Sequence, residues 1–87
     1  MNVIILERFD NEEEKLKNKA LSKQIENVIR NLFEVENIHD IPSLKRLKGA
    51  AAYRIRVGDY RLGITIEDNT VTFHSIGHRK RFYDSFP

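Results

Sequence analysis

The sequence predicts a small α+β domain, with a twisted antiparallel or mixed sheet of about four strands and an N-terminal helical hairpin packed on one face. Apolar and basic residues alternate on both sides of Gly58-Asp59, which is typical of a β-hairpin with one buried face. Over residues 20–36 the apolar residues recur every three or four positions and predict one helical stripe. Only the apolar face of the sheet is large enough to cover this stripe, so helix and sheet must pack together.

The predicted hairpin also groups three arginines. A two-residue turn sets three cross-strand pairs, namely Val57 with Tyr60, Arg56 with Arg61, and Arg54 with Gly63. One face then carries the apolar side chains Tyr53, Ile55, Val57, Tyr60, Leu62 and Ile64, and the other carries the arginines. Like charges opposite each other destabilise a sheet by about 0.2–1 kcal/mol. The facing arginines therefore indicate a binding site for a polyanion.

The first half of the chain predicts one strand and two helical segments. Asn2–Leu6 is a continuous β-favouring run, so we expect a strand that is buried on both faces or over most of one. Asp10 is the expected N-cap of a polar helix over 11–18. In the main helix over 20–36, Phe33 is expected to lie in the core with the rest of the stripe.

The second half adds at least one more strand. Residues 44–49 are compatible with a helical turn or with a short strand, and the sequence leaves both open. A turn at Asp68-Asn69 predicts a strand over 70–76 that places His74 opposite Gly63. The glycine leaves a shallow depression there, which marks either close approach of a ligand or backbone, or a bend in the strand.

The C-terminal segment combines cations with aromatic residues. Phe82 and Phe86 are four residues apart and are expected to anchor one helical turn on the body of the protein. Arg79 and Tyr83 would then lie together on another side of that turn.

Composition limits the class of protein. Eighty-seven residues, 40% hydrophobic and 32% charged, are expected to form one domain over residues 1–87. The absence of cysteine excludes disulfides and thiolate chemistry and suits a reducing compartment. The longest apolar run, Val3–Leu6, is too short to span a membrane, and no signal peptide is visible. We therefore expect a cytoplasmic protein without a membrane partner.

Charge is distributed unevenly along the chain. Residues 1–43 carry six basic and nine acidic side chains, whereas residues 44–87 carry nine basic and four acidic ones. This segregation indicates a nucleic acid or another phosphate partner for the second half. On charge alone, a merely solvated basic face is an equally good interpretation.

The sequence contains no convincing metal or cofactor motif. His39, His74 and His78 lack the spacing of metal-binding helices, and no glycine-rich phosphate loop or nucleophilic serine motif occurs. His74 is expected on the basic face, where neighbouring arginines oppose its protonation. We expect no metal and no cofactor.

Arginine clusters suit phosphate chemistry. The guanidinium group stays charged and binds phosphate through two hydrogen bonds. RNA carries its own nucleophile, the 2′-hydroxyl, so a protein that orients it and stabilises the transition state needs little acid–base equipment. The face of the predicted hairpin that carries Arg54, Arg56 and Arg61 could therefore cut RNA without a metal, or only bind it.

Several of these segments together resemble one known family. Leu44–Gly49 followed by Tyr53–Arg61, and Gly77-His78-Arg79 followed by Tyr83, are similar to the RelE/ParE superfamily of prokaryotic toxins, and the chain end is similar to its RelE-type members. The resemblance implies a RelE-like α+β fold and the toxin of a type II toxin–antitoxin pair. It also implies a protein antitoxin as partner, in a hetero-oligomer.

The resemblance further implies an activity and its residues. RelE-type members cleave messenger RNA in the ribosomal A site by attack of the 2′-hydroxyl. By position, Arg54 and Arg56 match residues that hold the RNA backbone, and Arg61 matches a phosphate contact. Arg79 matches the arginine that aids the leaving oxygen, and Tyr83 matches the tyrosine that stacks on the base and is assigned as general base. Further RNA contacts are expected at Lys45, Arg46, Lys48, His74, His78, Lys80 and Arg81.

The sequence also departs from the RelE pattern. Arg54 and Arg56 stand where the best-known members carry lysines, and arginine is a poor proton shuttle. Tyr83 follows Arg79 more closely than in some members. Two alternatives stay open: a ParE-type inhibitor of DNA gyrase, and a non-catalytic remnant that binds RNA or an antitoxin.

Overall fold

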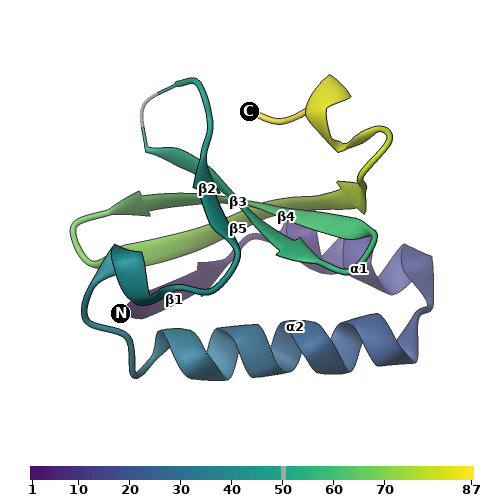
Figure 1. Cartoon of the computed structure of the whole chain (residues 1–87). Helices are drawn as coiled ribbons and strands as arrows, with labels where there is room; N and C mark the ends of the chain where they lie inside the picture. Colours follow the sequence, from purple (N-terminus) through teal and green to yellow (C-terminus); the bar gives the residue numbers. More distant parts are fainter. Residues whose placement is uncertain (50) are drawn as a thin grey trace.

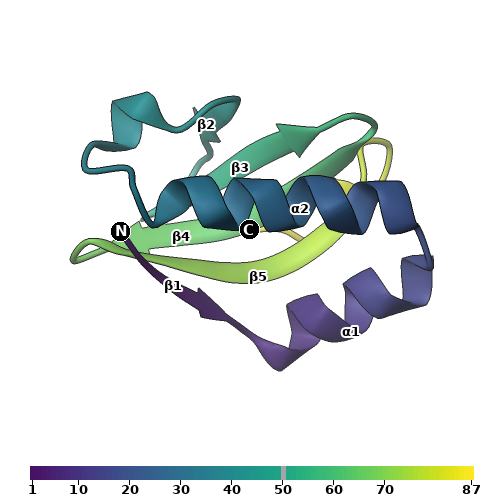
Figure 2. The same cartoon turned by 90° about the horizontal axis from the view of Figure 1, so that it is seen from below.

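The computed structural model describes residues 1–49 and 51–87 and contains a twisted mixed sheet with two helices on one face (Figures 1 and 2). The sheet has five strands in the order β1-β5-β4-β3-β2 within these residues. The strands are β1 (Asn2–Ile5), β2 (Leu44–Arg46), β3 (Ala52–Val57), β4 (Tyr60–Glu67) and β5 (Thr70–His78). The helices are α1 (Glu7–Leu16) and α2 (Lys19–Leu32), with the short 3₁₀ turns η1 (Ile38–Asp40) and η2 (Phe82–Asp84). The α+β class is confirmed, with one strand more than expected because residues 44–46 form a strand.

The central hairpin has the predicted register. Val57 pairs with Tyr60, Arg56 with Arg61, and Arg54 with Gly63. Gly58 has a φ of +58°, which a glycine adopts at little cost at the first centre of a tight turn. The turn at Asp68-Asn69 is also confirmed, and both residues have positive φ. These two turns fix which side chains of β3, β4 and β5 face the helices.

A β-bulge makes the predicted pairing of Gly63 with His74 wrong. The register of β4 and β5 shifts between Gly63 and Ile64, so Ile64 faces Phe73 whereas Gly63 faces Ser75. His74 is the extra residue of the bulge, which no alternation pattern reveals. The Ser75 side chain is consequently buried on the surface of the sheet that faces away from the helices.

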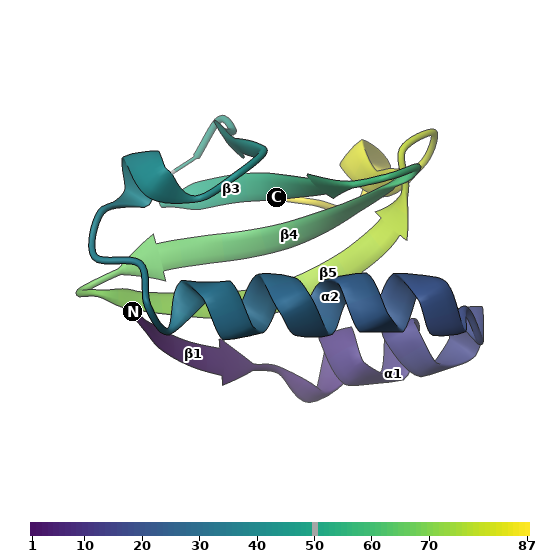
Figure 3. The same cartoon turned by 60° about the horizontal axis from the view of Figure 1, so that its bottom comes forward.

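The core lies between the helices and the apolar face of the sheet. The side chains of Leu21, Ile25 and Leu32 of α2 are buried in it, as the helical stripe predicts. From α1, Phe9 contacts Phe73 of β5 with ring centroids 5.2 Å apart. Figure 3 shows α1 and α2 side by side beneath the sheet. Neither described helix is long and apolar enough to cross a membrane.

Strand β1 is exposed, contrary to the expected burial. It pairs in parallel with β5 and forms one edge of the sheet, and the Ile4 side chain is 50% exposed. The continuous apolar run predicts a buried strand, but only one edge and part of one face of this strand are covered. Its first residue is tied down, because the amino terminus donates to the carbonyl oxygens of Leu32 and Val35 at 2.8 and 2.9 Å.

Two expectations about the helices are also wrong. Helix α1 begins at Glu7, directly after an extended Leu6, so Asp10 lies inside its first turn and is not its N-cap. Helix α2 ends at Leu32, and Phe33 is its C-cap with 61% exposure. The chain turns at that point, and the next core position is taken by Val35. The helix and its apolar stripe therefore end at Leu32, directly before Phe33.

The C-terminal segment packs on the opposite side of the sheet from α2 (Figure 1). Phe82 and Phe86 are buried against Ala52 and Leu47, forming a second, small apolar cluster. The predicted aromatic anchor is thus confirmed, with a 3₁₀ turn as its backbone. This segment lies on the surface that carries the arginines.

Candidate functional site

The three arginines of the hairpin lie on one surface of the sheet. Ile55 and Val57 are buried in the core on the helix side of the sheet. Arg54 and Arg56, at the alternate positions of β3, therefore project from the opposite surface of the sheet. Arg61 pairs with Arg56 and shares that surface. We call the surface that carries Arg54, Arg56 and Arg61 the arginine face.

Backbone carbonyl groups hold two of these side chains. Arg54 donates from Nη1 to the carbonyl oxygen of Ser43 at 2.9 Å. Arg61 donates from Nη1 to the carbonyl oxygens of Gly58 and Tyr60 at 3.1 and 3.0 Å. Within the described residues, no carboxylate pairs with Arg54, Arg56 or Arg61. Their positive charge is therefore not neutralised internally, and the two held guanidinium groups are partly ordered before any ligand binds.

Arg79 contacts Asp59 in the turn of the hairpin that carries Arg61. The backbone N–H of Arg79 donates to the carbonyl oxygen of Asp59 at 2.8 Å, next to the Gly58 carbonyl that Arg61 uses. Arg79 Nε also lies 3.9 Å from Asp59 Oδ1, but both side chains are exposed, so this ion pair is weak. The turn thus anchors the backbone of Arg79 on the hairpin that carries Arg61, which lies 18 positions earlier in the sequence.

Tyr83 projects from η2, on the same side of the sheet as the arginine face. Its ring packs edge-on against Phe82, with centroids 5.0 Å apart and planes at 80°. Half of the residue is exposed, so one surface of the ring remains available for stacking.

The seven expected RNA contacts do not all reach the arginine face. Lys45 does, because it pairs with Arg54 across β2 and β3. Arg46 pairs with Tyr53 and His78 pairs with Tyr60, so both lie on the helix side of the sheet. Exposed cations flank the face in its connecting segments, namely Lys48 after β2 and Lys80 and Arg81 before η2.

His74 lies at the bulge and bonds within the sheet. Its Nε2 is 2.8 Å from the Thr65 hydroxyl. Burial, and secondly the nearby positive charge of Arg8, lower the pKa of His74 from its usual value of 6.5. The direction agrees with the sequence prediction, but the charge belongs to a residue of α1 rather than to the strand arginines.

No local pattern predicts this role of Arg8. Beyond the end of β1, helix α1 covers the free edge of β5, where the backbone N–H of Ile76 donates to Glu12 Oε1 at 3.1 Å. The other oxygen of Glu12 lies 3.6 Å from Arg8 Nε. This contact between α1 and β5 spans 64 positions and depends on the tertiary fold.

We expect a pH dependence of stability from His74. The folded chain resists protonation of this ring and the unfolded chain does not, so the free energy of unfolding should fall as the pH drops from about 7 through the unfolded-state value near 6.5. The loss ends once the pH is below the folded-state pKa. Urea unfolding of the wild type and of His74→Gln, at several pH values between about 5 and 8, measures this slope.

The matched control for this measurement is His39→Gln, at an exposed histidine of η1. The slope should become shallower in His74→Gln and stay unchanged in His39→Gln. Equal slopes in the wild type and in His74→Gln would contradict the prediction.

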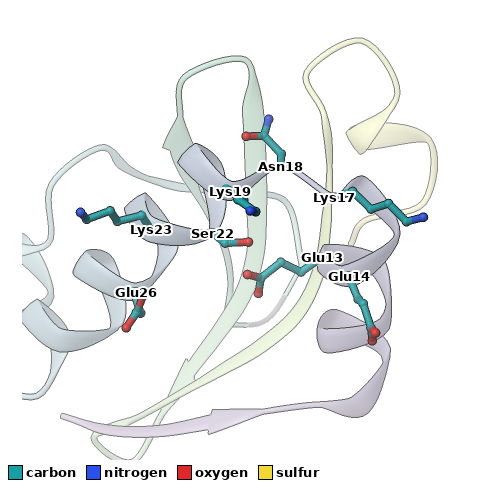
Figure 4. Close-up of a pocket in the computed structure, with 8 residues that line it drawn as sticks. All are labelled: Glu13, Glu14, Lys17, Asn18, Lys19, Ser22, Lys23 and Glu26. Carbon is teal, nitrogen blue, oxygen red and sulfur yellow. The ribbon is translucent and has the colours of Figure 1, made fainter.

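Other parts of the described chain offer no comparable cluster. A hollow of about 580 Å³ lies at the junction of α1 and α2, on the helix side of the molecule. Figure 4 shows that its charged side chains, which include Glu13, Lys17 and Lys23, point in different directions. Within the described residues, no group of three or more His, Asp or Glu side chains is placed to hold a metal ion.

Known proteins match both the sequence and the fold. The family model described as the ParE toxin of type II toxin–antitoxin systems matches residues 3–83. The protein named Toxin RelE3 from Methanocaldococcus jannaschii is 38% identical over 69 residues, which cover 77% of this chain and 78% of that protein.

Two solved structures share the fold. A chain of the RelB-RelE antitoxin–toxin complex from Methanococcus jannaschii matches with a TM-score of 0.80 and 30% identity, over 97% of this chain and 99% of that one. A chain of the toxin–antitoxin complex RelBE2 from Mycobacterium tuberculosis matches with a TM-score of 0.68 and 24% identity, over 90% and 96%, and supports the fold alone. The family model and the RelE relative together show that this chain belongs to the RelE/ParE superfamily of type II toxin–antitoxin toxins.

Proposed function

We propose that this toxin is an endoribonuclease that cleaves messenger RNA in the ribosomal A site without a metal ion. The observation that carries the proposal is the arginine face, where Arg54, Arg56 and Arg61 share one surface and no described carboxylate pairs with them. Arg79, at the same hairpin turn, extends this positive region toward the tail. Such a surface suits a phosphodiester and its more highly charged transition state.

The proposed reaction uses the nucleophile of the substrate. The 2′-oxygen attacks the neighbouring phosphorus, and its bond to phosphorus forms as the bond to the 5′-oxygen breaks, which leaves a cyclic phosphate and a free 5′-hydroxyl. Arg54, Arg56 and Arg61 hold the phosphate oxygens, and Arg79 stabilises charge on the leaving oxygen. Tyr83 stacks on the adjacent base and, as the phenolate, accepts the proton of the 2′-hydroxyl, while water gives a proton to the leaving 5′-oxygen. Orientation and electrostatic stabilisation supply most of the rate.

A protein antitoxin is the proposed partner that controls this activity. The printed descriptions of both solved relatives are of toxin–antitoxin complexes. We propose a corresponding hetero-oligomer in the cytoplasm, in which an acidic or apolar antitoxin segment covers the arginine face or the flank of the helices.

One further activity has a specific observation in its favour. The matching family model carries the description of the ParE toxin, and the ParE branch acts on DNA gyrase. In contrast, Arg79 and Tyr83 are both present at the RelE-type positions. A supercoiling assay with purified gyrase separates the two activities, because a nuclease toxin leaves supercoiling unchanged.

The direct test is to express the toxin briefly in cells and to map the ends of translated transcripts by primer extension. We expect new 5′ ends within translated codons, and none when translation is blocked first. Growth arrest with intact messages would contradict the nuclease and would favour the gyrase activity.

A further inference from the structure

The ring of Phe86 packs against Gly63 and holds the C-terminal segment on the arginine face. Phe86 is 7% exposed, and its ring lies over Gly63 of β4 so closely that a Cβ added there would be 2.8 Å from two ring carbons. Real Cβ atoms essentially never approach other atoms so closely. Gly63 is therefore required for this contact, and the depression that its missing side chain leaves is filled by Phe86.

Gly77 of β5 is a second glycine that lies against the C-terminal segment. A Cβ at Gly77 would lie 3.4 Å from the backbone of Phe82, at the distance of an ordinary van der Waals contact. The rings of Phe82 and Phe86 are 5.5 Å apart, and Phe86 also lies 6.0 Å from the His74 ring. The two phenylalanines thus rest on neighbouring strands, each above or beside a glycine.

Among the described residues, the backbone hydrogen bonds of residues 82–86 stay within the turn and Arg81, which directly precedes it. The backbone N–H of Phe86 donates to the carbonyl oxygen of Phe82 at 3.2 Å, and that of Ser85 donates to the same oxygen at 3.3 Å. The seating of this turn on the sheet therefore depends mainly on the two rings and on their apolar neighbours Ala52 and Leu47.

The segment that contains Tyr83 is consequently fixed at both ends. At one end, the N–H of Arg79 is bonded to Asp59 of the hairpin turn. At the other end, the ring of Phe86 packs closely against Gly63. Tyr83 lies between these two attachments, and half of the residue is exposed.

We propose that Phe86 is a positioning residue, which holds Tyr83 over the arginine face by its seat on Gly63. This inference rests on the proposed nuclease function. Without the seat, the turn keeps Phe82 and the upstream attachment at Arg79 but loses its C-terminal attachment, and Tyr83 samples positions away from the scissile phosphate. Misplacement of a catalytic group by about 1 Å is enough to lower a rate about a hundredfold.

The seat itself is testable without any substrate. An aromatic ring stacked on a glycine shifts the Hα resonances of that glycine upfield. We expect upfield Gly63 signals in the NMR spectrum of the wild type, and a return toward ordinary values in Phe86→Ala. Phe33→Ala, which removes an exposed phenylalanine at the end of α2, is the matched control and should leave these signals in place. Ordinary Gly63 shifts in the wild type would overturn the proposal.

The role in cleavage is tested by single-turnover cleavage of message on programmed ribosomes. Phe86→Ala should lower the maximal rate about tenfold to a hundredfold, with about a twofold change at most in the ribosome concentration that gives half the maximal rate. Gly63→Ala should act in the same direction, because its methyl group displaces the ring. The double variant should be no slower than Phe86→Ala alone, because in the absence of the ring the added methyl group has nothing to displace.

The outcomes separate the two proposals. A wild type that cuts no message would overturn the proposed function, and with it the role of Phe86 in cleavage. A wild type that cuts, together with a folded Phe86→Ala that cuts equally fast after losing the Gly63 shift, would overturn only the role of Phe86. If Phe86→Ala does not fold, Phe86→Leu and Gly63→Ala provide the same comparison, and unchanged rates in both would count against the proposal.

Discussion

Arg61→Ala is expected to slow single-turnover cleavage of message about a hundred- to a thousandfold, the loss typical of one preorganised oxyanion donor. Two backbone carbonyl groups hold the Arg61 side chain on the arginine face, so the guanidinium group needs little reorganisation when the transition state forms. Arg61 also belongs to a cross-strand pair in which two arginines face each other. Quench-flow cleavage on programmed ribosomes measures the rate.

The matched control for Arg61→Ala is Arg30→Ala. Arg30 lies on α2, its side chain is 75% exposed, and its contact is an exposed pair with Glu26. Cleavage should stay within about twofold of the wild type in this variant, since exposed pairs of this kind contribute little. If Arg61→Ala folds normally and cleaves at the rate of Arg30→Ala, Arg61 does not contact the scissile phosphate.

Phe73→Ala is expected to lower the free energy of unfolding by about 3–5 kcal/mol. Phe73 is fully buried in β5, packs edge-on against Phe9 of α1, and pairs with both Ile5 and Ile64. Its removal leaves a cavity where α1 meets the sheet. The total stability of a domain of this size is typically about 5–15 kcal/mol, so the loss is a large part of it. Urea unfolding followed by circular dichroism measures the change.

Phe33→Ala supplies the reference for Phe73→Ala, because the same side chain is removed from an exposed position. We expect a change within about 0.5 kcal/mol for this variant. Comparable losses in the two variants would mean that the apolar face of α2 and the sheet do not form the core as described.

Patterns of short range predicted most of the fold. Alternation with a period of two, interrupted by a turn-forming pair, fixed the register of β3 and β4, and the apolar stripe identified the core face of α2. The errors lie where tertiary packing decides. Whether a run such as Val3–Leu6 is buried depends on its place at the edge of the sheet, and the end of α2 before Phe33 depends on where the chain must turn.

In the candidate site, too, local patterns predicted some features and tertiary packing decided the others. The shared surface of Arg54, Arg56 and Arg61 follows from alternation and one turn, and the structure places them so. The positions of Arg46 and His78 on the helix side depend on pairings that the sequence did not specify. The bulge at His74 and the seat of Phe86 on Gly63 bring together residues that share no local pattern.

The parallel pairing of β1 with β5 has a consequence for biosynthesis. Asn2 is paired with Thr70, so β1 cannot pair until β5, which follows the other strands of the described residues in chain order, has been synthesised. Contacts between such distant parts of a chain form late, because the intervening loop must close first. The proposed nuclease should therefore stay inactive in the nascent polypeptide until β5 has been released from the exit tunnel.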